Sequence, residues 1–140
     1  MAKNEYHEHL KLVPMFTDLG PHELDVIGQV ATQLDFEAGK VLVREGTAAH
    51  EMFIVMEGEL EVSRGGEHIA DIGPGSFAGE MALLTHAPRS ATISTKTDVV
   101  TLHIDGRSFD TLLDEVPQLA VAMLPIVAAR VVENSQDPVH

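Results

Sequence analysis

From residue 73 to residue 95 the chain reads Gly-Pro-Gly-Ser-Phe-Ala-Gly-Glu-Met-Ala-Leu-Leu-Thr-His-Ala-Pro-Arg-Ser-Ala-Thr-Ile-Ser-Thr, and this stretch decides the fold around it. The glycines and proline at residues 73–75 end a predicted strand. Residues 77–84 are predicted to form a short helix with Gly79 and Glu80 in its first turn. The N–H groups at the start of a helix attract anions because they carry partial positive charge. The stretch therefore predicts an anion pocket.

Three residues narrow the class of anion that this pocket is expected to bind. The planar guanidinium of Arg89 suits two oxygens of one phosphate. Gly79 leaves room for a ligand to approach the backbone, where a Cβ would stand in the way. Glu80 would repel a phosphate, so we expect it to accept a hydrogen bond from a ribose hydroxyl, which predicts a nucleotide. The alternative is that Glu80 caps the helix and pairs with Arg89 as an ordinary ion pair, with the glycines serving only as turns.

The spacing of these residues resembles a known cassette. From residue 77 to residue 92 the chain reads Phe-x-Gly-Glu-x-Ala-Leu-Leu, three residues, then Pro-Arg-Ser-Ala-Thr. This run is similar to the phosphate-binding cassette of the cyclic-nucleotide-binding domain family, which includes the regulatory subunits of cAMP-dependent protein kinase and the bacterial catabolite activators.

The resemblance implies a role for each cassette residue. Glu80 would bind the ribose hydroxyl and Arg89 the cyclic phosphate. The N–H of Ala82 and the N–H or hydroxyl of Ser90 would complete the phosphate shell. The expected ligand-binding residues are Phe77, Gly79, Glu80, Met81, Ala82, Arg89, Ser90, Ala91, Arg130 and Asn134.

Composition limits the classes of function. The chain has 140 residues, no cysteine and a formal net charge of −13. Such a charge disfavours nucleic acid and anionic membranes, both of which attract clusters of Lys and Arg. The N-terminus lacks the order of a signal peptide, and no apolar run approaches about 20 residues. We therefore expect a cytoplasmic protein that binds neither nucleic acid nor membrane.

The rest of the chain predicts a single, mainly β domain with flanking helices. Residues 1–33 are expected to form an N-terminal segment of two helices. Residues 34–105 alternate short apolar runs with glycines, which is typical of a β jelly-roll barrel, with the cassette at residues 73–92 as its helical insertion. Gly65-Gly66 is a hairpin signal within it. Residues 106–140 are expected to form two C-terminal helices.

The last predicted helix runs from residue 118 to about residue 134. Its segment 119–129 is continuously apolar, so one side should cover the barrel and another should contact a second partner. Family resemblance implies that this helix forms a homodimer seam and covers the purine. Pro125 departs from the family pattern and predicts a kink.

Three residues of this helix are expected at the ligand through the resemblance alone. Aligned on Pro117, Arg130 falls near the Glu80 position and the ribose, and Asn134 and Ser135 fall on the base. The alternative is that all three belong to the polar end of a helix.

We therefore expect a non-catalytic regulatory module that binds a 3′,5′-cyclic nucleotide and couples it to helix rearrangement. Hydrolysis of a cyclic phosphate would need metal ions or a base that activates water, and the cassette offers neither, so no metal and no cofactor beyond the ligand are expected. cAMP is favoured over cGMP because Ser90 resembles the bacterial cAMP receptors. The signal would pass to an unknown protein effector.

Two alternatives stay open. The chain resembles the sensor part of a larger transcription regulator, since catabolite activators place a DNA-binding element after this helix. A cupin-type metal-binding jelly roll is the other. That site needs a strand His-x-His with a further Glu and His, whereas His50, His68, His86 and His103 are isolated from one another in the sequence.

Overall fold

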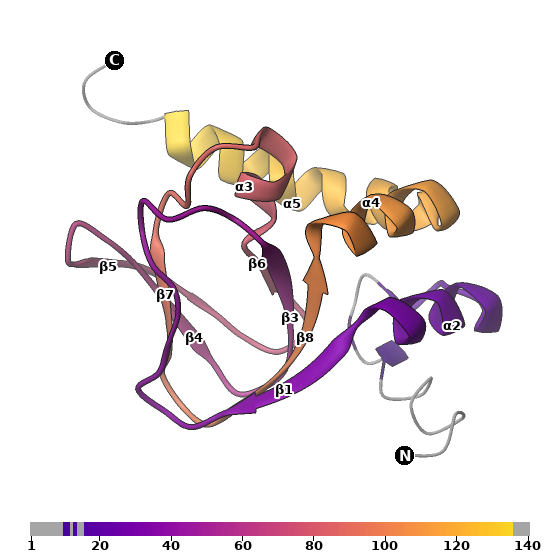
Figure 1. Cartoon of the computed structure of the whole chain (residues 1–140), viewed down its shortest axis with the longest axis horizontal. Coiled ribbons are helices and arrows are strands. Elements are labelled where there is room, and N and C mark those ends of the chain that lie inside the picture. Colours follow the sequence, from indigo (N-terminus) through magenta and orange to yellow (C-terminus); the bar gives the residue numbers. More distant parts are fainter. Residues whose placement is uncertain (1–9, 12, 14–15, 136–140) are drawn as a thin grey trace.

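The chain forms two antiparallel sheets flanked by helices (Figure 1). A computed structural model describes residues 10–11, 13 and 16–135, with side chains up to residue 132. The strands are β1 (Thr32–Phe36), β2 (Val41–Val43), β3 (Glu51–Glu57), β4 (Leu60–Arg64), β5 (Glu67–Ile72), β6 (Phe77–Ala78), β7 (Thr92–Thr95) and β8 (Val99–Asp105).

Strand order confirms the predicted β fold. One four-stranded sheet has the order β1-β8-β3-β6 and the other β2-β7-β4-β5. The chain crosses between the two sheets repeatedly, which produces a two-sheet jelly-roll sandwich rather than a ring of strands. The hairpin between β4 and β5 turns at Gly65 and Gly66, with φ of 60° and 84°. Both values lie in the left-handed region that a two-residue turn of this kind requires.

The helix predicted over residues 77–84 is wrong at its start. Phe77 and Ala78 form β6 and pair with Ile54 and Phe53 of β3. The helix that follows, α3 (Glu80–Thr85), begins only after Gly79. Both β6 side chains are buried, so pairing and burial override the helical spacing of the local sequence.

The helices otherwise match the expectation from sequence. They are α2 (Pro21–Val30), α4 (Gly106–Glu115) and α5 (Pro117–Ser135). α2 has proline at its first position, and the carboxylate of Asp105 caps α4 by accepting a 2.8 Å hydrogen bond from the Ser108 N–H. The predicted first helix lies outside the described residues apart from Leu10 and Lys11.

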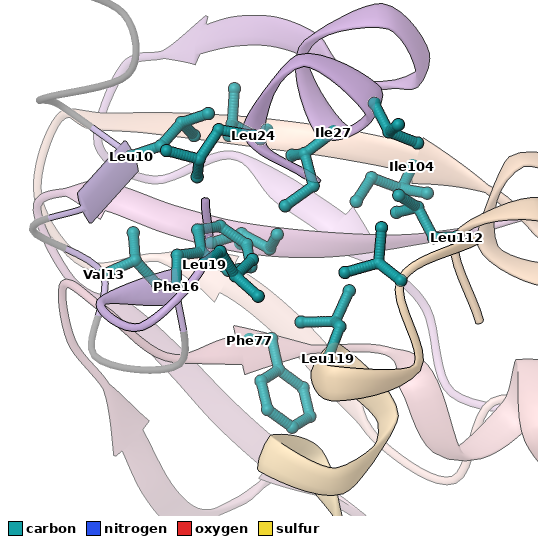
Figure 2. Packing of buried hydrophobic residues seen from close by; sticks show 14 of the residues in the cluster. Leu10, Val13, Phe16, Leu19, Leu24, Ile27, Phe77, Ile104, Leu112 and Leu119 are labelled. Carbon is teal, nitrogen blue, oxygen red and sulfur yellow. The ribbon is translucent and has the colours of Figure 1, made fainter. Parts of the chain in front are cut away.

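Two apolar cores hold these layers together. The larger packs α2, α4 and α5 against the outer face of the β1-β8-β3-β6 sheet, and Figure 2 shows Leu24, Ile27, Leu112 and Leu119 gathered over that face. The smaller fills the space between the two sheets. Its members are Val43, Phe53, Val55, Leu60, Ala78, Ile93 and Val99.

α5 is buried along one face only. Leu119 and Met123 are buried in the larger core, whereas Val121 and Leu124 are 66% and 62% exposed. The helix continues through Pro125 as one element. Over the described residues no single helix is long and apolar enough to cross a membrane. α4 and α5 meet those criteria only as a pair, bent by 113° at their junction.

Candidate functional site

The cassette is shaped by a left-handed residue between β6 and α3. Gly79 has φ 85° and ψ 0°, a conformation in which a Cβ is strained. A Cβ at this position would lie 2.7 Å from Nη1 of Arg89 and 3.3 Å from the carbonyl oxygen of Glu51. Sequence analysis explained the glycine by the close approach of a ligand. In the structure, the Arg89 side chain already occupies the space that a Cβ at this position would need.

Arg89 is a buried cation held by backbone. Its side chain is 6% exposed, Nη1 donates to the Gly79 carbonyl at 2.7 Å, and Nη2 donates to the Glu51 carbonyl at 2.5 Å. Burial lowers the pKa of its guanidinium, and the negative charges of Glu51 and Glu80 raise it. Within the described residues no carboxylate makes an ion pair with it. A buried guanidinium of this kind is a strong site for an anion.

Glu80 pairs with a residue of α5 instead of with Arg89. Its side chain is 1% exposed, and Oε1 accepts a hydrogen bond of 2.5 Å from Nη1 of Arg130. The alternative of a Glu80–Arg89 ion pair is therefore wrong. The other carboxylate oxygen, Oε2, is buried and has no hydrogen-bond partner among the described residues.

Arg130 joins α5 to the cassette through three contacts. Besides its bond to Glu80, Nη2 donates to the carbonyl oxygen of Phe77 at 2.7 Å. Its guanidinium also lies over the Phe77 ring, 4.7 Å from the centroid. The expected proximity of Arg130 to Glu80 is thus observed, although these positions lie 50 residues apart.

A cavity of about 360 Å³ opens in front of these groups. Three of the five arginines in the sequence line it, namely Arg64, Arg89 and Arg130. We call it the arginine-lined cavity. Its volume falls within the range of roughly 300–1,000 Å³ typical of small-molecule sites. A protein with a net charge of −13 thus places most of its arginines around the arginine-lined cavity.

The structure brings most of the predicted site residues to this cavity. Phe77 is absent from the lining and instead supports Arg130 from beneath. Asn134 and Ser135 belong to the last turns of α5, but their side chains lie outside the described part of the chain. The predicted residues that line the cavity are Gly79, Glu80, Met81, Ala82, Arg89, Ser90, Ala91 and Arg130.

Sequence analysis missed the cavity wall contributed by β4 and β5. Val62 and Arg64 line it from β4, and Ile69 lines it from β5. The register shifts between Val62 and Ser63, because Val62 pairs with Ala70 while Ser63 pairs with His68. Ile69 is thus the extra residue of a bulge. No sequence signal marks a bulge, but the alternation of residues 60, 62 and 64 along one strand face could have identified Arg64.

Polar groups also occur outside the arginine-lined cavity. A second cavity of about 640 Å³ includes His50, His86 and Asp110 in its lining. His103 of β8 packs against Phe36 and Phe53, and burial lowers the pKa of its imidazole to about 4. No group of three or more His, Cys, Asp or Glu side chains that could hold a metal occurs among the residues described.

Comparison with known families identifies the class of protein that this fold and cavity define. Residues 33–116 match the family model of the cyclic nucleotide-binding domain. The chain therefore belongs to the cyclic nucleotide-binding domain family. The match confirms the resemblance read from the cassette.

Individual relatives come from different kinds of protein. The chain is 38% identical over 108 residues to a cyclic nucleotide-gated potassium channel of Mesorhizobium japonicum, a match that covers 77% of this chain and 30% of the channel. It is 37% identical over 118 residues to a cAMP-dependent protein kinase regulatory subunit of Yarrowia lipolytica, covering 81% of this chain and 31% of that subunit. The chain thus spans less than a third of the length of these two relatives.

A solved structure shares the fold. The Thermus thermophilus catabolite activator protein superimposes with a TM-score of 0.77 at 27% sequence identity, covering 87% of this chain and 60% of that one. Channel, kinase and activator relatives therefore share the binding domain, while the remainder of each relative extends beyond the matched region.

Proposed function

We propose that this chain binds a 3′,5′-cyclic nucleotide in the arginine-lined cavity and releases it unchanged. The observation that carries the proposal is the buried Oε2 of Glu80, which has no hydrogen-bond partner among the described residues and belongs to the same cavity as the buried Arg89. An unpaired buried acceptor costs about 1–3 kcal/mol. A ligand that presents both a hydroxyl and a phosphate satisfies both residues at once.

Ribose recognition would fall to Glu80. A carboxylate only accepts hydrogen bonds, so its partner must be a donor, and the 2′-hydroxyl of a 3′,5′-cyclic nucleotide is one. The bond from Arg130 to Oε1 fixes the carboxylate and leaves Oε2 as the acceptor. Oε2 is therefore oriented before any ligand arrives, which reduces the entropy lost on binding.

Phosphate recognition would fall to Arg89, with the N–H of Ala82 and Ser90 beside it. Arg89 carries more N–H donors than its two bonds to backbone carbonyls use. The net charge of −13 repels an anion at long range, so affinity must come from these local donors. On this proposal Arg130 and Asn134 approach the ribose and base from α5.

Of the two common cyclic nucleotides we propose cAMP as the preferred one. Ser90 lines the cavity directly after Arg89. The Yarrowia lipolytica relative is named as cAMP-dependent. The channel relative is named only by cyclic nucleotide, so cGMP is the competitor that an experiment must include.

Binding would be coupled to the position of α5. The hydrogen bonds from Arg130 to Glu80 and to the Phe77 carbonyl already connect α5 to the cassette. A nucleotide that contacts Glu80 changes the surroundings of Arg130, and so favours one arrangement of α5. The size of that shift equals the difference in ligand affinity between the two arrangements.

We further propose a homodimer through α5. Val121, Leu124 and Val132 are exposed apolar residues, and the first two lie one helical turn apart. A self-complementary apolar stripe suits a two-fold interface. In sedimentation velocity, Leu124→Glu should shift the protein toward monomer, while Val41→Glu on β2, also exposed, should leave it unchanged. A wild-type protein that stays monomeric at high concentration would contradict this interface.

The proposed role is regulatory rather than enzymatic, with a protein effector as the receiver and a cytoplasmic site of action. A second candidate is the sensor part of a larger regulator, which is supported by the share of about a third or less that the chain makes up of its channel and kinase relatives. Incubating the protein with cAMP and following phosphorus NMR should leave the cyclic phosphate signal unchanged. A growing 5′-AMP signal would contradict the non-catalytic role.

The decisive experiment for the proposal is calorimetric titration with cAMP, cGMP and 5′-AMP. We expect saturable binding of cAMP, weaker binding of cGMP, and little binding of 5′-AMP, whose phosphate is dianionic and not cyclised onto the ribose. Absence of saturation by both cyclic nucleotides at millimolar concentration would refute the proposed function.

A further inference from the structure

Of the three arginines that line the cavity, Arg64 is the one to which the proposed function assigns no role. Arg89 is buried against two backbone carbonyls, and Arg130 is held by Glu80 and the Phe77 carbonyl. Arg64 lines the same cavity from the end of β4. Its presence in the lining therefore calls for a separate explanation.

The fold directs this side chain inward. Leu60, Val62 and Arg64 alternate along β4, and Leu60 and Val62 pack in the core between the sheets. Alternating residues of a strand share one face. Arg64 therefore continues an inward-facing row at the edge of the sandwich, where that row opens into the arginine-lined cavity.

Arg64 also contacts the cassette directly. Its Nε donates a 2.9 Å hydrogen bond to the carbonyl oxygen of Ser90. Ser90 follows Arg89 in the chain, so Arg64 contacts the cassette at the residue next to the buried arginine. The β4 arginine is thus attached to the part of the cavity that carries the phosphate-binding donors of the proposed function.

The acidic side chains that line the cavity already have partners of their own. Glu80 is paired with Arg130, and Asp71 accepts hydrogen bonds from His68 at 2.8 Å and from Lys96 at 3.2 Å. Among the acidic side chains of the lining, both therefore have cationic or donor partners. A guanidinium near Ser90 consequently adds to the positive potential at the phosphate position.

We propose that Arg64 is a second phosphate-binding residue, which lines the arginine-lined cavity together with Arg89 and contacts the cyclic phosphate of the bound nucleotide. This inference rests on the proposed function. A cyclic phosphate diester carries one negative charge and two non-bridging oxygens, so it offers acceptors to cations on two sides. Arg64 remains exposed to solvent, which makes its contribution smaller than that of Arg89 and sensitive to salt.

Charge-matched variants test the assignment. Arg64→Gln removes the cation inside the cavity, and Arg44→Gln makes the same change in net charge at an exposed position outside it. Calorimetric titration at low salt should give about tenfold weaker cAMP binding for Arg64→Gln, less than twofold for Arg44→Gln, and partial recovery for Arg64→Lys. Thermal unfolding of all three variants should stay close to the wild type.

The choice of nucleotide separates a phosphate contact from a base contact. Because cAMP and cGMP share the same phosphate, Arg64→Gln should weaken both by the same factor, and added salt should shrink that factor. A change in the ratio of the two affinities would assign Arg64 to the base and overturn the proposal, as would unchanged cAMP affinity in Arg64→Gln. If the wild type binds neither nucleotide, the proposed function itself fails, and this inference fails with it.

Discussion

Two buried polar atoms lack a hydrogen-bond partner among the described residues, and their surroundings differ. Oε2 of Glu80 belongs to a side chain that lines a cavity shared with three arginines. Nε2 of His103 belongs to a ring packed 4.4 Å from Phe53 and 5.7 Å from Phe36, centroid to centroid. An unpaired buried polar atom indicates a ligand only where a cavity and complementary charge accompany it. Without them it indicates a group that folding keeps neutral.

The largest expected effect is at the cavity. Arg89→Ala should weaken cAMP binding by at least about 100-fold, because it removes a charged donor of the phosphate. The fold should persist, because within the described residues the Arg89 side chain bonds to the carbonyls of Gly79 and Glu51, while the backbone bonds of residue 89 to Gly46 and Thr47 remain in the alanine variant. Calorimetry and circular dichroism measure the two effects. Arg44→Ala is the control, and retained affinity in Arg89→Ala would locate the phosphate elsewhere.

The next largest effect on affinity is expected at the ribose contact. A double-mutant-style cycle isolates it by combining a change in the ligand with a change in the protein. Wild-type protein should bind 2′-deoxy-cAMP about 10–100-fold more weakly than cAMP, as expected for a hydrogen bond to a charged group. Glu80→Ala should bind the two nucleotides alike. Asp71→Ala, which removes another carboxylate of the cavity lining, should keep the wild-type preference. A preference that survives in Glu80→Ala would show that another group reads the hydroxyl.

For His103 the comparison predicts a pH effect on stability rather than on binding. Burial lowers the pKa of this imidazole from 6.5 to about 4, so between these values the unfolded chain takes up a proton that the folded chain does not. This group therefore lowers stability as pH falls from about 6.5 to about 4 and makes no further change below that. Urea unfolding should show a loss of roughly 2 kcal/mol from this group between pH 7 and pH 5.

His103→Leu should remove that loss. His22→Leu, at an exposed position of α2, should retain it. Equal pH dependence in the wild type and His103→Leu would mean that other groups carry the acid sensitivity.

The smallest effect concerns the turn that builds the cassette. Gly79→Ala and Gly39→Ala both place a Cβ at a positive φ, of 85° and 86°, which costs about 1–2 kcal/mol. Only at Gly79 does the Cβ also meet Arg89, since nothing lies within 4 Å at Gly39. We expect Gly79→Ala to be the less stable variant and the only one that binds cAMP more weakly. Equal binding by both would show that Arg89 moves aside without consequence.

Sequence patterns predicted the parts of this molecule that depend on local spacing. The cassette residues and the strand and turn signals placed Glu80 and Arg89 in one pocket. The expectation for Arg130 rested on the family resemblance, aligned on Pro117 at the start of α5. The cassette features need only spacing along the chain.

Other features depend on contacts between distant segments. Phe77 and Ala78 form a strand because β3 is there to pair with them. Glu80 pairs with Arg130, while the guanidinium of Arg89 is bonded to the backbone carbonyls of Gly79 and Glu51. Arg64 escaped notice because its place in the cavity depends on how the β4–β5 hairpin meets the cassette. No local pattern contains this information.

The account depends most on the pairing of Glu80 and Arg89 with one nucleotide. A crystal structure of the protein with saturating cAMP tests it directly. We predict that Oε2 of Glu80 lies about 2.5–3.0 Å from the ribose O2′, with Arg89 on the phosphate. A nucleotide bound outside the arginine-lined cavity, or one whose 2′-hydroxyl faces away from Glu80, would contradict the account.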